Sequence, residues 1–151
     1  LGVTSHFGGS LTHGGDYLTR YFPLGKGPGS QSEDPQPSFF VDVIEPMLAV
    51  SCYQCHGPEK NKGGLRLDSQ EALLDGGDSG PLFVPGNRAQ SEIYYRITLS
   101  QDDEDFMPPK GDVLTESQIA IIGWWIDHHA SFTMTMAEAK TDPELAAWVE
   151  K

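Results

Sequence analysis

The chain has 151 residues and a formal net charge of −12, from 22 acidic and 10 basic side chains. This balance argues against nucleic-acid binding and against docking on anionic lipid, because the chain lacks a basic surface to replace counterions. No apolar run approaches the roughly 20 residues that span a bilayer, so we expect a soluble chain. The 17 glycines and 11 prolines predict a fold rich in loops and turns.

Composition divides the chain into three parts. Residues 1–37 are rich in glycine and proline, and we interpret them as an N-terminal extension that ends in a stiff linker. A short helical turn is predicted within it at 16–21. Residues 38–131 carry the patterns of a folded domain, and 132–151 form a C-terminal tail with a short helix over 142–149. Because the chain begins without a basic-then-apolar leader, we expect it to be a piece of a longer protein.

Helix signals follow in order along the domain. Ser38 is a candidate N-cap before an apolar run that Pro46 interrupts. Either a turn ends there, or a helix restarts at the proline and runs into Cys52. Ser69 and Ser91 are predicted to open two further short helices.

The strongest helix signal is the capping-box pattern Thr115–Gln118. Residues 100–113 before it form an acidic loop, and the helix should end near His129. Its apolar side chains lie on one stripe at helical spacing, namely Ile119, Ile122, Trp125 and Ile126. No strand-like alternation is convincing beyond Leu65–Leu67, so the sequence predicts a mainly α fold.

The two cysteines of the chain lie in the pentapeptide Cys52-Tyr53-Gln54-Cys55-His56. This C-x-x-C-H spacing is the attachment signature of c-type haem. The two thiols would add across the haem vinyl groups, and the histidine would lie beneath the iron as the proximal ligand. Two other interpretations remain open. A disulfide would suit a redox C-x-x-C motif, which usually adjoins a βαβ unit, and a zinc site would need further ligands that the remaining histidines do not offer at suitable spacing.

Met107 is the candidate for the second axial ligand. It lies in the segment Asp105–Pro109, between the acidic loop and the capping box. A thioether is a soft, neutral ligand that suits ferrous haem and raises its potential, and the two prolines that follow would fix the backbone that presents it. A lone methionine more often fills a core. The other methionines are placed differently: Met47 lies beside the attachment motif, and Met134 and Met136 lie in the polar tail.

The stretch from Phe39 to Ala130 resembles a small class I c-type cytochrome, and most closely the planctomycete-type cytochrome c domain. The family usually has a glycine before the alanine that ends the last helix, and this chain has His129 there. The matching pieces occur in the family's order: Val43–Leu48, Cys52–Pro58, Lys62–Ser69, Gly76–Gly80, Val84–Gly86, Ser91, Arg96–Ile97, Met107–Pro109 and Trp125–Ile126.

The resemblance implies a class I cytochrome c fold of about four short helices around one covalently bound haem. The thioether bonds would form at Cys52 and Cys55, and the axial ligands of the iron would be His56 and Met107. Residues Gly9–Thr19 are also similar to a segment that follows a multi-helix membrane domain in proteins with this cytochrome downstream. This second similarity suggests that the piece comes from a membrane-anchored parent.

Further residues are candidates for contact with the haem. Arg66 and Arg96 are cations flanked by apolar residues and would suit the haem propionates, with solvated surface arginines as the alternative. Trp125 should face the haem pocket, and its neighbour Trp124 would cover an edge. Pro85, in one of the matching pieces, is also assigned to haem binding.

Histidines and carboxylates outside the motif are weaker candidates. His128 and His129 should end the last long helix, where cations suit the helix dipole, although they could instead ligate a metal. His13 could become a ligand in a rearranged state. The acidic run Asp102–Asp105 is usually just a solvated loop, but it could bind Ca²⁺ or form a docking patch beside Met107.

These patterns predict an electron-transfer protein, a one-electron carrier with a single His/Met-ligated haem c, rather than an enzyme. With both axial positions filled, substrate cannot reach the iron. The alternatives are a haem-based enzyme or gas sensor with an open or displaceable distal position, and a binding module in which the haem is structural. We expect a redox partner with a basic docking patch, and a periplasmic or extracytoplasmic location with a tether through a missing N-terminal anchor.

Overall fold

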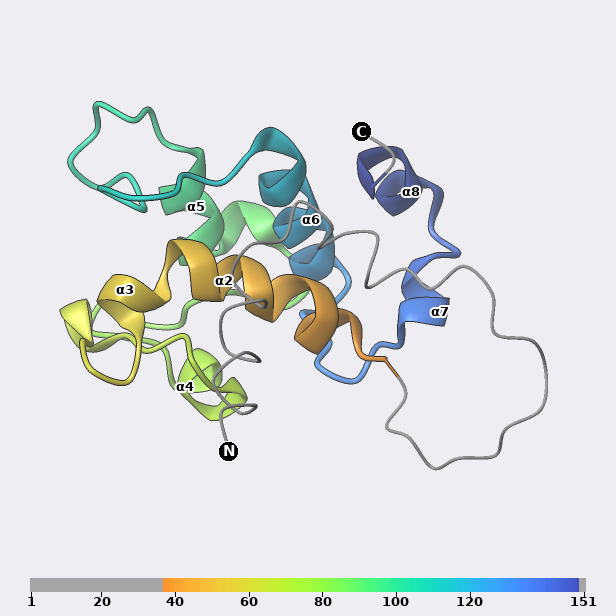
Figure 1. Cartoon of the computed structure of the whole chain (residues 1–151), viewed down its shortest axis with the longest axis horizontal. Helices are drawn as coiled ribbons and strands as arrows, with labels where there is room; N and C mark the ends of the chain where they lie inside the picture. Colours follow the sequence, from red (N-terminus) through yellow and green to blue (C-terminus); the bar gives the residue numbers. More distant parts are fainter. Residues whose placement is uncertain (1–36, 150–151) are drawn as a thin grey trace, which may run out of the picture. The chain divides into compact units, whose positions relative to one another are not determined.

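The computed structural model of the chain describes residues 37–149 (Figure 1). The predicted extension before Pro37, with its helical turn at 16–21, lies outside these residues. The described part contains seven α-helices: α2 Glu45–Ser51, α3 Tyr53–His56, α4 Gln70–Asp75, α5 Glu92–Thr98, α6 Glu116–Asp127, α7 Met136–Ala139 and α8 Pro143–Val149. Between residues 37 and 149, strand-type pairing is limited to isolated bridges. The mainly α fold predicted from the sequence is confirmed.

The chain enters the attachment motif through two consecutive helical segments. Phe40–Ile44 forms a π-helical turn, and α2 follows with Pro46 in its first turn. The second of the two alternatives for the proline is therefore correct, because a first-turn residue needs no intrahelical N–H bond. Cys52 ends α2 with φ −121°, and the single-turn helix α3 carries Cys55 and His56.

Both helices that were predicted to begin after a serine are present. The Ser69 hydroxyl caps α4 by accepting a hydrogen bond from the N–H of Ala72 at 3.2 Å. Ser91 precedes α5, but its buried hydroxyl makes no cap. It accepts from the N–H of Val84 at 2.9 Å and donates to the Asn87 carbonyl at 2.8 Å. Ser91 therefore fastens the preceding loop to the start of α5.

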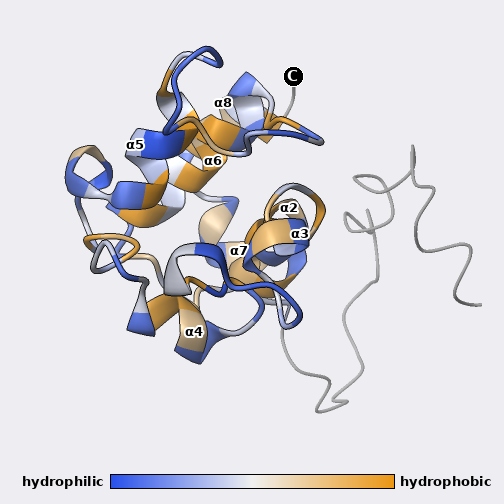
Figure 2. Ribbon diagram, turned by 90° about the vertical axis from the view of Figure 1, so that its left-hand side faces the viewer, coloured by the Kyte–Doolittle hydropathy of each residue, from blue (hydrophilic) through white to orange (hydrophobic). Residues whose placement is uncertain are grey.

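α6 is the longest helix of the described part and the most deeply buried. Thr115 and Gln118 form the predicted capping box at its start. Its buried surface is wider than the predicted stripe, because every residue of 121–126 is buried. Figure 2 accordingly shows the hydrophobic colour along much of the α6 ribbon. Other segments therefore cover this helix on more than one side.

The two adjacent tryptophans of α6 pack on different neighbours. Trp124 stacks on His128, with ring centroids 4.0 Å apart. Trp125 donates a hydrogen bond from Nε1 to the Ser131 carbonyl at 2.9 Å, and its ring lies among Phe40, Phe83 and Phe132. Both indoles are almost completely buried, so each has a packing role in the core.

The chain leaves α6 through two residues in the left-handed region, close to the predicted helix end. His129 has φ 64° and Ala130 has φ 48°. This conformation costs a residue with a Cβ roughly 1–2 kcal/mol, and glycine adopts it without that cost. The backbone therefore favours glycine at position 129, which is where the sequence departs from the cytochrome pattern.

We expect His129→Gly to raise the free energy of unfolding by up to about 1 kcal/mol, because it removes left-handed strain at an exposed position. The imidazole lies against Gly86, and the loss of that contact limits the gain. Urea unfolding measures the change. The control is Ala120→Gly inside α6, which should lower the stability by about 1 kcal/mol. If both variants lost stability equally, position 129 would not be strained.

The segment after Ala130 packs against the start of the domain. The Met134 carbonyl accepts a hydrogen bond from the N–H of Phe39, and the N–H of Met136 donates to the Pro37 carbonyl, both at 2.9 Å. Met136 is buried, contrary to its assignment to a polar tail, because this pairing turns its side chain into the core. α8 forms where a final short helix was predicted, whereas α7 was not predicted.

No helix between residues 37 and 149 has both the length and the apolar character that a bilayer crossing requires.

Candidate functional site

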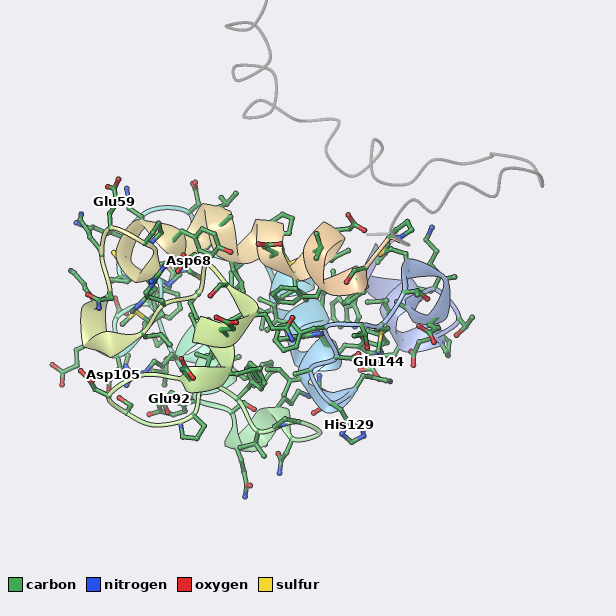
Figure 3. The ribbon with its side chains drawn as sticks, turned by 90° about the horizontal axis from the view of Figure 1, so that it is seen from below. Glu59, Asp68, Glu92, Asp105, His129 and Glu144 are labelled. Carbon is green, nitrogen blue, oxygen red and sulfur yellow. The ribbon has the colours of Figure 1, made fainter. Side chains whose placement is uncertain are left out.

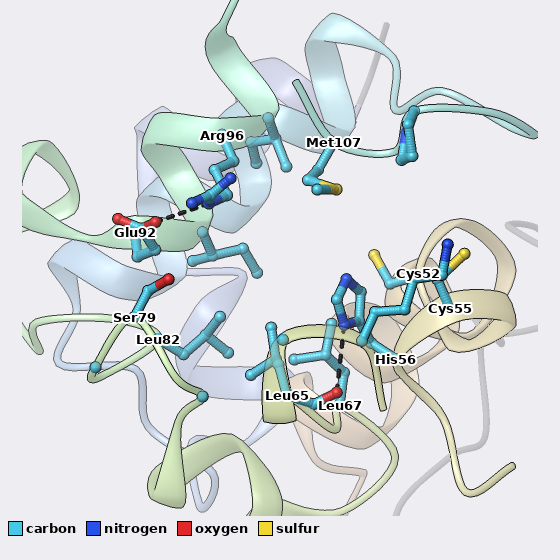
Figure 4. Close-up of a pocket in the computed structure, with 17 residues that line it drawn as sticks. Cys52, Cys55, His56, Leu65, Leu67, Ser79, Leu82, Glu92, Arg96 and Met107 are labelled. Carbon is cyan, nitrogen blue, oxygen red and sulfur yellow. Dashed lines mark hydrogen bonds and ion pairs between the residues drawn. The ribbon is translucent and has the colours of Figure 1, made fainter. Parts of the chain in front are cut away.

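A largely apolar cavity of about 220 Å³ lies between α3, α5 and the loops that connect the short helices (Figure 4). Five of the residues singled out in the sequence lie on its wall: Cys52, Cys55, His56, Arg96 and Met107. They come from three separate segments of the chain. The remaining wall residues are Lys62, Gly63, Leu65, Leu67, Gly77, Ser79, Gly80, Leu82, Glu92, Ile93, Ile97 and Pro109.

The two thiols are free and lie on the same side of the cavity as His56 (Figure 4). Burial, with a smaller contribution from Cys55, raises the pKa of the Cys52 thiol to about 12. A redox-active C-x-x-C motif instead lowers a thiol pKa through an electropositive setting. The surroundings of Cys52 thus favour a neutral, protonated sulfur in an apolar wall, which does not suit a redox dithiol.

His56 is oriented by the loop that follows it. Its Nδ1 donates a hydrogen bond to the Leu65 carbonyl at 3.3 Å, and its own carbonyl accepts from the N–H of Leu67 at 2.8 Å. The chain turns at Gly57, where a Cβ would clash with the Tyr53 carbonyl oxygen. The Nδ1 bond leaves Nε2 as the free nitrogen, and Figure 4 shows the ring directed toward Met107 across the cavity.

Met107 is held in place by α5. Its N–H donates to the Arg96 carbonyl at 3.2 Å, and the preceding Phe106 is buried. Arg96 also contacts Asp105, with Nη1 3.1 Å from Oδ1. These three ties fix the loop from Asp105 to the backbone of Met107, so the thioether can face His56 without a large loss of entropy on binding.

Arg96 and Glu92 form an ion pair on the wall, which also carries Lys62 and Ser79. Arg96 Nε donates to Glu92 Oε1 at 2.7 Å, and Figure 4 shows the pair across the cavity from the two cysteines. The hydrogen bond to Glu92 is the main cause of the raised pKa of Arg96. Sequence reasoning missed Glu92, although its spacing of four residues before an arginine on a helix is a recognisable ion-pair signal. It also missed Lys62 and Ser79, which had no such signal.

Three other predicted haem contacts lie off the cavity wall. Arg66 is paired with Asp68 at 2.6 Å between Nη2 and Oδ2, and its side chain is 45% exposed. Trp125 is buried in the aromatic cluster described above, and Pro85 is exposed. None of the three lines the cavity, so the geometry gives no support to a role for them at the haem.

The weaker metal-ligand candidates are dispersed. His128 is 3.4 Å from Asp142 through Nε2, which links α6 to the start of α8, and His129 is exposed. His13 lies outside the described residues. The run Asp102–Asp105 is exposed, and its last member is bound to Arg96. In residues 37–149, no group of three or more His, Cys, Asp or Glu side chains is placed to hold a metal ion.

Comparison with known families adds to this geometry. Residues 52–111 match the model of a family described as planctomycete cytochrome C. This match supports a planctomycete-type cytochrome c domain around residues 52–111, called the cytochrome domain below. The matched part contains the attachment motif, α4, α5, the Met107 loop and the loops that connect them, and every residue on the cavity wall lies within it. No curated protein and no solved structure matches the chain.

The residues of the cytochrome domain fit a haem. Two free thiols lie on one side of the cavity, in the spacing that thioether attachment requires. An imidazole and a thioether face each other across it, and these are the usual axial donors of a cytochrome c iron. Three leucines and two isoleucines are among the remaining wall residues, and such side chains suit the apolar faces of a porphyrin.

Proposed function

We propose that the cytochrome domain is a one-electron carrier with a single haem c, ligated by His56 and Met107. The family supports haem-based electron transfer as the general function. The observation that supports the single His/Met-ligated haem is that both thiols, the His56 imidazole and the Met107 thioether line one apolar cavity.

Each of these side chains has a distinct part in the proposal. When bound, the haem supplies a reversible Fe(III)/Fe(II) couple. Cys52 and Cys55 would hold it through thioether bonds, and the Nδ1 hydrogen bond of His56 would leave Nε2 free to bind the iron. Met107 offers a neutral sulfur that favours the ferrous state. The apolar wall excludes water, which keeps reorganisation small during electron transfer.

Arg96 is the candidate partner for a haem propionate. It lies across the cavity from the cysteines, as the propionates do from the vinyl positions of a haem. A guanidinium carries five N–H donors in a planar fork, and its contacts with Glu92 and Asp105 go through Nε and Nη1. The fork can therefore bind a further carboxylate at the same time.

An electron carrier has its distal iron position filled by a protein ligand, here Met107, whereas a haem enzyme or gas sensor keeps that position open or displaceable. The ferric protein should show the weak sulfur–iron charge-transfer band of a methionine ligand, and the ferrous protein should bind CO slowly and incompletely. Reversible oxidation and reduction in direct voltammetry should accompany both results. Rapid and complete binding of CO to the ferrous protein would instead support an open site and would count against the carrier.

We further propose that the partner docks through a basic patch onto the acidic loop. Asp102 and Glu104 are exposed and precede Met107 closely in the chain. Opposite charges steer encounter and raise the association rate, with screening over about 8 Å at physiological salt. The bimolecular electron-transfer rate with the physiological partner should therefore fall steeply as ionic strength rises.

The salt dependence should be weaker in the double variant Asp102→Asn, Glu104→Gln. These positions are chosen because Asp103 and Asp105 make hydrogen bonds that shape the loop. The control, Glu71→Gln with Asp75→Asn, makes the same change of charge on the exposed side of α4 and should keep the full dependence. A flat dependence in the unaltered protein would exclude electrostatic docking and would favour an apolar contact around the haem edge or transfer within the parent chain.

We also propose that the domain works outside the cytoplasmic membrane, tethered through a preceding part of its parent protein. Cytochrome c domains are typically extracytoplasmic, where haem attachment takes place. Expression with an export signal and the attachment machinery should give red holoprotein, and cytosolic expression without either should give apoprotein. Holoprotein formed in the cytosol without that machinery would contradict this location.

A further inference from the structure

The charged side chains of the cavity wall are few. Among the wall residues that the structure describes, Glu92 is the one carboxylate. Its side chain is only 35% exposed, and half of the other wall residues are leucine, isoleucine or glycine. A half-buried carboxylate in such a wall is costly unless something pairs with it.

Glu92 is held in the wall by Arg96. The two side chains lie one helical turn apart on α5, with Nε 2.7 Å from Oε1, and that of Arg96 is 26% exposed. Arg96 is shared with a second carboxylate, because its Nη1 also lies 3.1 Å from Asp105 Oδ1. One positive charge therefore faces two negative charges, and the trio keeps a net charge of −1.

Glu92 and Arg96 line the proposed haem cavity, so the charge of the trio would act on the iron. The other cation of the wall, Lys62, is exposed and better screened. Reduction removes one positive charge from the haem, so a nearby fixed negative charge stabilises the oxidised state and lowers the potential. The effect is stronger in an apolar cavity than in water, because charges interact more strongly at low dielectric. The Asp105 carboxylate is 55% exposed and better screened, which leaves Glu92 as the more effective of the two.

We propose that Glu92 is a potential-setting residue: a fixed negative charge, positioned by Arg96 in the cavity wall, that lowers the reduction potential of the haem against the rise caused by Met107. The inference rests on the proposed haem c and deepens it, because it assigns to this chain's own residue the control of which partners it can reduce. The opposing interpretation is that Glu92 only braces Arg96 and, through it, the Met107 loop.

The test is a potentiometric titration of the holoprotein and its variants at 0.1 M ionic strength. Glu92→Gln keeps the shape of the side chain and removes its charge. We expect it to shift the reduction equilibrium toward the ferrous state by about threefold to tenfold, where tenfold is about 59 mV for a one-electron couple. Glu92→Asp keeps the charge and should leave the potential close to that of the unaltered protein, even if the shorter side chain lowers stability.

Glu144→Gln is the matched control. It makes the same change of charge on α8, at a side chain that is 55% exposed, lies off the cavity wall and is 3.9 Å from Arg88. Figure 3 shows Glu144 apart from Glu92 and Asp105. Its reduction equilibrium should change by less than twofold. An equal shift in the two glutamine variants, or no shift in Glu92→Gln, would overturn the proposal.

The sign of the shift separates the two interpretations. If Glu92 only braced the Met107 loop, Glu92→Gln would lower the potential and weaken the ferric sulfur–iron band, because the methionine would leave the iron. That result would overturn the proposal while the haem c carrier would stand. Absence of covalently bound haem from the unaltered protein would overturn both.

Discussion

Met107→Ala should lower the midpoint potential of the haem by roughly 0.2 V or more, within the span of about 0.8 V that axial ligands set. The structure directs the thioether of Met107 at His56 across the cavity, and a neutral sulfur ligand favours Fe(II). Its loss would leave water or no protein ligand at the distal position. The ferric sulfur–iron band should disappear, and ferrous protein should bind CO quickly and completely.

Met47→Ala is the matched control for this prediction. Met47 is half-buried in α2 and does not line the cavity, so its truncation should reduce stability and leave the potential and the ferric band unchanged. An unchanged potential in Met107→Ala, with CO still excluded from the ferrous iron, would show that another side chain ligates the iron.

The double variant Cys52→Ser, Cys55→Ser should lose all covalently bound haem. In the unaltered protein, acid–acetone should leave the red colour with the polypeptide, because thioether bonds survive the extraction. In the double variant any haem that binds is held only by its axial ligands and the apolar wall, so the colour should pass into the organic phase. Either single variant keeps one sulfur, and should retain a covalent product.

Tyr53→Phe is the control for the cysteine variants, because it alters the same pentapeptide without touching a sulfur. The Tyr53 hydroxyl is buried and has no hydrogen-bond partner in the described structure, and burial raises its pKa to about 12. Its removal should be neutral or stabilising and should leave the haem attached. Colour that remained with the double serine variant would show that attachment does not use these cysteines.

Local sequence patterns predicted most of the helices, because the hydrogen bonds that cap a helix form between residues a few positions apart. The serine before α4 and the capping box of α6 each satisfy an N–H group within one turn, and the chain folds as they indicate. α7 was missed because a four-residue helix is too short to show periodicity. Its place depends on the pairing of residues 134–136 with 37–39, which lie almost a hundred residues away in the chain.

The candidate site was predictable to the extent that its residues are neighbours in sequence. The C-x-x-C-H spacing brings two thiols and an imidazole together within one helical turn. Met107 lies about fifty residues after His56, and its place at the cavity depends on how the Met107 loop is held by α5. Local patterns do not give that placement, so the prediction of Met107 as a ligand needed the resemblance to a family. Trp125 lies on the predicted apolar stripe, but a stripe does not say which neighbour it meets, and here an aromatic cluster covers it.

The charged residues show the same limit. The sequence could not distinguish Arg66, which pairs with a carboxylate two residues away on the surface, from Arg96, which faces the cavity. Both arginines have apolar neighbours in the sequence. They differ only in the direction in which the backbone presents the side chain, which the structure shows and the sequence does not. Glu92 became a candidate only when that direction was known.

The central claim is that Cys52 and Cys55 together bind one haem covalently. Its most direct test is the intact mass of the red protein, exported with the attachment machinery and measured under denaturing conditions. We predict a single species heavier than the polypeptide by the mass of one haem, with the added mass on the proteolytic peptide that contains 52–56. A denatured mass equal to that of the bare polypeptide, with free haem released, would contradict the account.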